Sequence, residues 1–191
     1  KLDGNHWKKR KKTFLPLFEA KMVQAYDHRA AGIVIKSENW VRQGQTEPTS
    51  PVAHQNPEFV PMPRWWVDEK EVDAKLPSTD KSAFLSYKDV TSPTNERTMI
   101  ASFIPRAGVV NSAPLMLCDS AIGPTLECGL LANLNSFAFD FVARQKVGNV
   151  HLNFFIVEQL PLLPPDAYAK KHPWTGRQTL ERWVADRVLK L

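Results

Sequence analysis

Polar and basic side chains are concentrated in the segment SYKDVTSPTNERTMIASFIPRAG, which covers residues 86–108 and runs into an apolar, β-branched stretch. Lys88, Asn95, Arg97 and Arg106 are spread along this segment. Arginine and lysine bind phosphates and guanine edges, whereas asparagine favours adenine edges. Because the segment leads into an expected strand, we expect these side chains at the rim of a sheet, where they can contact a polyanion.

Two further segments carry the same residue types. A cluster of Arg, Lys and Asn surrounds a glycine at the end of an expected helix, near residue 148. A stretch rich in Pro, Gln, Thr and Ser, residues 42–63, reads as a long loop, and loops of this length are usually functional or disordered. The candidate nucleic-acid contacts are Lys88, Asn95, Arg97, Arg106, Arg144, Lys146 and Asn149, with Arg42, Gln43, Gln45 and Arg64 on the second surface.

Patterns associated with catalysis are weak in this chain. The sequence NPEF, residues 56–59, is close to the Asn-Pro-Pro-aromatic motif of amino-methyltransferases, but Glu58 replaces the second proline and no Gly-rich cofactor turn precedes it. Glu19 and Lys21 form the Glu-x-Lys pair of some metal-dependent nucleases, which needs a further upstream acid and usually a strand. We therefore predict no catalytic residue in this segment.

Metal and cofactor sites are also not predicted. The five histidines are scattered without metal-ligand spacing, and Cys118 and Cys128 lack a CxxC partner. Two cysteines are too few for a disulfide framework, so we expect a reducing cytoplasm. We predict no metal and no cofactor bound by this segment itself.

Bulk properties favour a globular, DNA-compatible chain. The 191 residues suit one domain with a small appendage, and the 43% hydrophobic content allows a packed core. The formal net charge of +5 favours a polyanionic partner. No apolar run reaches 18 residues, so we expect no transmembrane helix and no membrane partner. The charged start without an initiator Met or a signal peptide suggests a part of a longer protein.

Hydrophobic spacing predicts a mixed α/β fold, with a central mixed or antiparallel sheet flanked by helices and followed by a C-terminal helix. Phe137 and Phe141 lie on the apolar stripe of the strongest expected helix, so we expect both to be buried. Helices are expected at about 16–31, 68–76, 129–147 and 177–191, and Asp68 is expected to cap the second of them. Strands are expected within 32–36, 83–90, 97–105, 113–119 and 151–165.

Four segments together resemble a known family. They are FLPLFEAKMVQAYDHRAA, PRWWVDEKEV, the 86–108 segment and LNSFAFDFVARQKVGNVHLNFFIVEQLPLLPP. In this order they resemble the C-terminal target-recognition (specificity) domain of type IIG-like, adenine-specific DNA methyltransferases and related phage-defence methylases. The resemblance extends from about Thr13 to about Tyr168, and the last segment is also similar to type I restriction specificity subunits.

The resemblance implies a DNA-reading module whose partners are double-stranded DNA and an upstream catalytic domain of the same polypeptide. S-adenosylmethionine is implied only for that catalytic part. The implied division is a basic linker at 1–12, a target-recognition domain at 13–168 and an amphipathic helix at 169–191. For individual residues, two alternatives stay open: residues 8–12 contact phosphates, and Arg97 pairs with Glu96 or Asp89 to hold its loop. For the whole chain, the alternatives are a protein-interaction domain of the same enzyme and a stand-alone nuclease or hydrolase, which would need a metal or nucleophile constellation that the sequence does not show.

Overall fold

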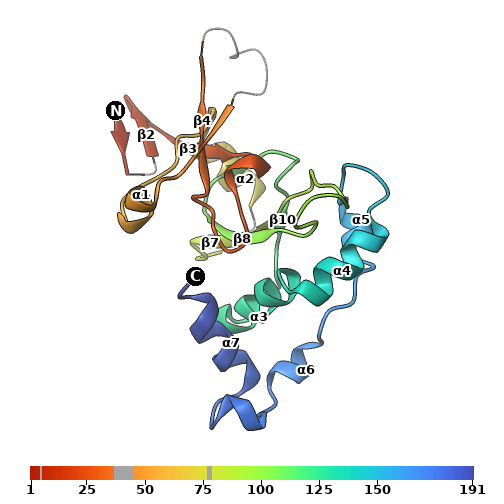
Figure 1. Cartoon of the computed structure of the whole chain (residues 1–191). Helices are drawn as coiled ribbons and strands as arrows, with labels where there is room; N and C mark the ends of the chain where they lie inside the picture. Colours follow the sequence, from red (N-terminus) through yellow and green to blue (C-terminus); the bar gives the residue numbers. More distant parts are fainter. Residues whose placement is uncertain (5, 37–44, 77–78) are drawn as a thin grey trace.

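The sheets and two short helices occupy one part of the molecule, and the remaining helices occupy the other (Figure 1). The computed structural model describes residues 1–191 apart from 5, 37–44 and 77–78. The chain has a mixed α/β fold, as predicted, with its sheets followed by a helical region that ends in a C-terminal helix. No helix in this described part of the chain is long and apolar enough to cross a bilayer.

The first sheet begins with an antiparallel hairpin. β1 (Leu2–Asp3), β2 (His6–Lys9) and β3 (Lys12–Phe18) pair in sequence, and β6 (Trp65–Asp68) pairs with the other side of β3. The tight turn between β2 and β3 places Arg10 at a φ of 57°, in the left-handed region. The residues expected to form a basic linker are thus strands of this sheet.

The prediction of a helix at about 16–31 is wrong. Strand β3 ends at Phe18, a single 3-10 turn, η1, covers Ala20–Met22, and the chain then extends towards β4 (Ala31–Val34). Pro16 has no N–H to donate, and it lies where the neighbour of β3 changes from β2 to the parallel β9 (Gly108–Val109). The missing N–H of Pro16 therefore does not interrupt a continuous series of hydrogen bonds with one neighbouring strand.

Close packing at β9 requires a glycine. A side chain at Gly108 would come within 2.6 Å of Val67 and 2.8 Å of Leu17. The absence of a Cβ lets β9 approach β3 at this point.

The segment expected as a long loop contains regular structure. β5 (Gln45–Pro48) pairs antiparallel with β4, and α1 (Pro51–Gln55) follows it. Ser50 caps α1 by accepting the N–H of Ala53 at 3.2 Å. These local pairings explain why the segment is not an open loop throughout. Arg42 and Gln43 lie outside the described residues.

A second sheet connects the two halves of the molecule. β7 (Ala83–Tyr87) pairs with β8 (Ala101–Pro105) on one side and β10 (Leu115–Met116) on the other. Leu85 and Tyr87 pack into the core beneath the helices, whereas Ile104 packs into a second core with Phe18 and Met22. Apolar residues on both faces explain the nearly continuous hydrophobic character of these strands, which were predicted.

The long helix expected at 129–147 is two helices, α3 (Pro124–Leu134) and α4 (Phe137–Lys146). The break lies at Asn135 and Ser136, and the Ser136 side chain caps α4 by accepting the N–H of Phe139 at 3.2 Å. The break rotates α4 so that Phe139 is 2% exposed, whereas Phe137 is 82% and Phe141 65% exposed. The expectation that Phe137 and Phe141 are buried is therefore wrong.

The remaining elements are helical. α2 (Glu69–Lys75) was predicted together with its Asp68 cap, which accepts the N–H of Lys70 at 3.2 Å. The strand expected at 151–165 is wrong, because only His151 forms a bridge before α5 (Phe154–Val157) begins. α6 (Pro165–Tyr168) and the 3-10 turn η2 (Pro173–Thr175) lead into α7 (Leu180–Val188), which packs on α3.

Candidate nucleic-acid interface

Two polar segments that are distant in the sequence meet at one rim. The N–H of Thr91 donates to the carbonyl of Val150 at 3.0 Å, and the N–H of Leu152 donates to that of Asp89 at 2.7 Å. His151 Nδ1 lies 2.6 Å from an Asp89 carboxylate oxygen. The turn after α4 is thereby joined to the segment that follows β7 and carries Lys88.

Arg144 connects α4 to the loop at residues 92–98, which we call the rim loop. Its guanidinium donates to the carbonyl oxygens of Pro93 at 2.6 Å, Asn95 at 2.9 Å and Glu96 at 2.9 Å. A fourth contact, at 3.1 Å, joins it to the carboxylate of Asp140 one helical turn earlier. With its donors used in this way, Arg144 holds the shape of the loop.

Asp140 is the buried centre of the rim. One carboxylate oxygen accepts the backbone N–H groups of Thr98 at 2.8 Å and Met99 at 2.7 Å. Burial favours the neutral form, but these donors, together with Arg144 and Arg97, outweigh it and lower the pKa of Asp140 below its usual value. The carboxylate is therefore charged at neutral pH and stabilises the start of the strand region after the rim loop.

Arg97 also makes intramolecular contacts, but its acidic partner is not one of the two that the sequence suggested. Its Nε lies 3.5 Å from Asp140, and its Nη2 donates to the carbonyl of Asn135 at 2.5 Å. The guanidinium carbon lies 4.7 Å from the centre of the exposed Phe137 ring. Its ion-pair partner is Asp140 rather than Glu96 or Asp89.

Other side chains of the rim remain available to a ligand. Asn95 and Lys146 are exposed. The side chain of Asn149, also exposed, accepts the N–H of His151 at 3.1 Å and keeps its amide donors free of that contact. Lys88 is half-buried, and burial lowers its pKa. The rim is therefore a mixed polar surface on which Arg97 and Arg144 make contacts within the protein.

The remaining candidates lie elsewhere. Arg106 pairs with Asp73 of α2. Gln45 is exposed on β5, and the guanidinium carbon of Arg64 lies 5.1 Å from the centre of the Trp65 ring. The structure thus gathers Lys88, Asn95, Arg97, Arg144, Lys146 and Asn149 in one region and separates Arg106, Gln45 and Arg64 from it.

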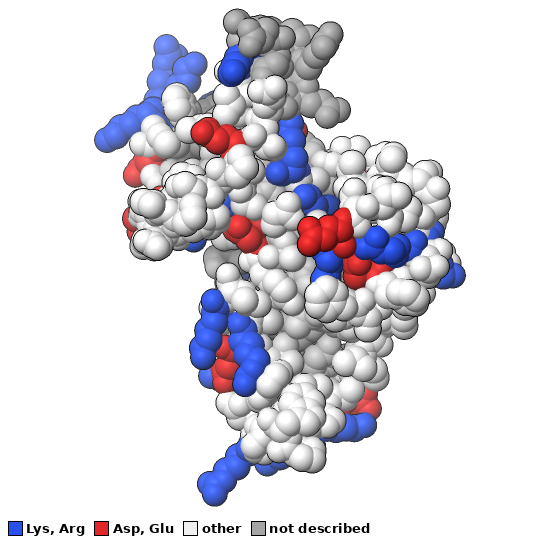
Figure 2. Space-filling model, viewed as in Figure 1, with Lys and Arg blue, Asp and Glu red and all other residues white. Residues whose placement is uncertain are grey.

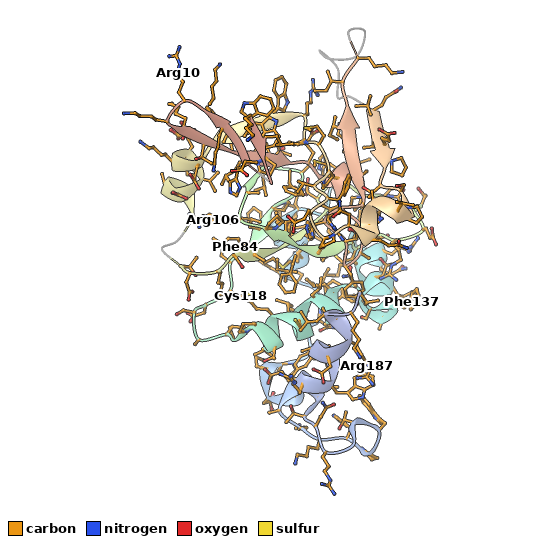
Figure 3. The ribbon with its side chains drawn as sticks, turned by 90° about the vertical axis from the view of Figure 1, so that its left-hand side faces the viewer. Arg10, Phe84, Arg106, Cys118, Phe137 and Arg187 are labelled. Atoms are coloured by element: carbon orange, nitrogen blue, oxygen red, sulfur yellow. The ribbon has the colours of Figure 1, made fainter. Side chains whose placement is uncertain are left out.

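The β2–β3 hairpin carries a denser positive charge than the rim. Lys8 pairs with Asp3 at 2.6 Å, and Lys12 pairs with Asp68 at 2.9 Å. Lys9, Arg10 and Lys11 are exposed and have no acidic partner among the described residues. Basic side chains project from this corner in Figure 2, and Arg10 points away from the body of the molecule in Figure 3. We call Lys9–Lys11 the basic tip.

No site residue was assigned to this hairpin from the sequence, although phosphate contact by residues 8–12 was an open alternative. One sequence feature could have indicated the hairpin. Trp7 and Phe14 flank the basic run, and an antiparallel hairpin pairs these two residues directly. Within the described ranges, no group of three or more His, Cys, Asp or Glu side chains is arranged to hold a metal ion. Comparisons with protein-family models, curated proteins and solved structures found no match to this chain.

Proposed function

We propose that this chain is the DNA sequence-recognition domain of a SAM-dependent, adenine-specific DNA methyltransferase of a restriction–modification or related defence system. It binds duplex DNA in the cytoplasm and positions the target adenine for an upstream catalytic domain. That catalytic domain, not this segment, binds S-adenosylmethionine and transfers the methyl group. The resemblance of the four sequence segments supports the family, and the surface described above supports the binding of DNA.

The observation that carries this proposal is the basic tip. Three neighbouring cations without acidic partners in the described structure stand at the turn of the β2–β3 hairpin, which projects from a corner of the first sheet (Figure 3). A projecting turn of this kind can reach the phosphates that border a groove of DNA, and each phosphate that it neutralises releases counterions. The exposed side chains of Asn95, Lys146 and Asn149 provide further polar groups for phosphates and base edges.

Salt-dependent binding tests the proposal. We expect the triple variant Lys9→Ala/Arg10→Ala/Lys11→Ala to bind a fluorescein-labelled duplex more weakly than the wild type. Between about 50 and 200 mM salt, the slope of log K against log salt should fall in magnitude by about 2–3, since each phosphate contact contributes about 0.9. Fluorescence anisotropy measures both quantities.

The matched control removes the same charge from another region. Lys170, Lys171 and Arg177 are exposed near α6 and η2, in the part of the molecule remote from the hairpin in Figure 1. The variant Lys170→Ala/Lys171→Ala/Arg177→Ala should retain the wild-type slope. Equal losses in the two triple variants would show that only net charge matters, and no duplex binding by the wild type would overturn the proposal.

A protein-interaction role in the same kind of enzyme is the second candidate. The observation that favours it is the exposure of Phe137, Phe141, Phe154 (68%) and Phe155 (53%) on two helices. Large exposed apolar side chains mark contacts with other proteins or domains. If this role holds, Phe137→Ser/Phe141→Ser abolishes association with the rest of the enzyme and leaves the affinity for DNA unchanged.

A further inference from the structure

Three aromatic side chains share one face of the hairpin sheet. Trp7 pairs directly with Phe14 across β2 and β3, and Pro16 pairs with Trp66 across β3 and β6. Residues that are paired across strands, or are two apart in one strand, lie on the same face. Trp7, Phe14 and Trp66 are therefore neighbours, and the ring centres of Trp7 and Trp66 are 6.0 Å apart with their planes inclined at 48°.

These aromatic rings line an open cleft. The cleft has a volume of about 300 Å³ and is lined by Trp7, Lys9, Phe14 and Trp66, which we call the aromatic cleft. Trp7 is 40% exposed, and Phe14 and Trp66 are half-buried. The cleft is thus an apolar surface that the described chain leaves in contact with solvent.

Apolar side chains on the other face of the same sheet are buried, so the exposure of the aromatic rings is confined to part of the sheet. Leu15, on the opposite face from Phe14, is only 2% exposed, and Val72 of α2, the helix that packs against β3 and β6, is 6% exposed. Along the aromatic face itself, Pro16 is fully buried. The aromatic face is therefore buried at Pro16 and exposed at the cleft, which lies next to the basic tip.

The charges around the cleft are suited to one kind of ligand. Lys9 lines it directly, and Arg10 and Lys11 follow in the turn. Asp68 lies on the same face, but its carboxylate is 2.9 Å from the ammonium of Lys12. Among the residues that the structure describes, no acidic side chain lines the cleft. A flat apolar group attached to phosphates matches this combination of aromatic rings and cations.

We propose that the aromatic cleft binds an unpaired nucleobase of DNA, while Lys9 and the rest of the basic tip neutralise the adjoining phosphates. Since the two indole rings are inclined at 48°, a base that lies flat on Trp7 is tilted with respect to Trp66, rather than held between parallel rings. Stacking on aromatic side chains is the usual way in which proteins hold unpaired bases without reading their sequence. This inference rests on the proposed DNA-binding function and adds an unpaired strand to its substrate.

Single-stranded DNA with and without bases tests the stacking. The 191-residue chain is titrated with a labelled oligothymidine, with the same oligomer in which abasic linkers replace the central nucleotides, and with a duplex. We expect the wild type to bind the oligothymidine more tightly than the abasic oligomer, although their phosphates are the same. Trp7→Leu should reduce affinity for the oligothymidine by about 5- to 100-fold and leave affinity for the abasic oligomer unchanged.

The neighbouring tryptophan provides a matched control. Trp65 is adjacent to Trp66 in β6 but projects to the opposite face, and it is 46% exposed. Trp65→Leu should bind all three DNAs like the wild type. Trp7→Phe keeps a flat ring in the hairpin and should retain most of the affinity for oligothymidine, which guards against a variant that loses its fold.

The outcomes separate this inference from the proposed function. Equal binding of Trp7→Leu and wild type to the oligothymidine, with duplex binding intact, overturns the aromatic cleft alone. Binding of the oligothymidine without any binding of duplex supports the cleft and overturns the proposed duplex reader. No binding of any of the three DNAs overturns both.

Discussion

Removing the carboxylate of Asp140 should destabilise the fold strongly. The side chain is 5% exposed and accepts the N–H groups of Thr98 and Met99, which are themselves fully buried. Asp140→Ala leaves those two donors unpaired, at about 1–3 kcal/mol each, and removes the acid that faces Arg144 and Arg97. Asp140 is almost fully buried, whereas the two arginines are partly exposed and keep some contact with water when the acid is removed. We therefore expect a total loss of about 3–5 kcal/mol in the free energy of unfolding.

Asp140→Asn separates the two contributions. An amide oxygen still accepts both backbone N–H groups, so this variant loses the negative charge and the second oxygen, which accepts from Arg144. We expect a loss of roughly 1–2 kcal/mol at pH 7, from the difference between charged and neutral hydrogen bonds. Urea unfolding followed by tryptophan fluorescence measures both variants. As a control, Asp166→Asn removes an exposed carboxylate on α6 and should change stability by less than about 0.5 kcal/mol.

Acid should narrow the difference between wild type and Asp140→Asn. The pKa of Asp140 is lower in the folded chain than in the unfolded chain, so the unfolded state takes up its proton first as the pH falls. The stabilisation is fully present above the unfolded pKa of about 3.9 and is lost as the pH falls through the folded pKa. A wild-type advantage that stays constant between about pH 6 and pH 2, or a loss below about 1 kcal/mol in Asp140→Ala, would refute this account.

Two further predictions concern the helices. Asn135→Ala should cost about 2–4 kcal/mol in urea unfolding, because its buried amide both accepts from and donates to the backbone of Ala101 at 2.9 Å; a variant that unfolds at the wild-type midpoint would contradict this role. Phe139→Ala should cost about 3–5 kcal/mol, whereas Phe137→Ala and Phe141→Ala should each cost under about 1 kcal/mol, as their exposures require; equal costs for the three would mean that α4 faces another way.

Local signals in the sequence were sufficient for some elements. The strands β4, β7, β8 and β10 were predicted because each is short, apolar and bounded by turn residues. The α2 helix was predicted because Asp68 is a good cap before a run of helix formers. In these elements, the local sequence signals agree with the conformation that long-range pairing and packing also favour.

Contacts between distant residues decided the elements that were wrong. Phe18 and Met22 have helical spacing, but β3 is a strand because it pairs with β6, about fifty residues later. The stripe through Phe137 and Phe141 faces outward because the Asn135 amide bonds to Ala101 and interrupts the helix. Neither pairing leaves a mark in the local hydrophobic pattern.

The candidate site was anticipated only in part. The sequence indicated that the rim loop and the end of α4 carry similar side chains, and the structure brings them together. It gave no sign that Arg144 binds three backbone carbonyls or that Arg97 pairs with Asp140, since both depend on how the loop folds over the helix. The aromatic cleft was missed because residues 1–12 were expected to form a linker, so that no strand pairing Trp7 with Phe14 was predicted.

The way in which Arg144 holds the rim loop bears on how such a surface can evolve. Its guanidinium grips backbone carbonyls, which every amino acid possesses, rather than the side chains of Thr94, Asn95 or Glu96. Substitutions at those three exposed positions therefore leave the contacts of Arg144 with the loop backbone in place. Selection can change what the loop presents without rebuilding the framework beneath it, and a library randomised at these positions should consist mostly of folded proteins.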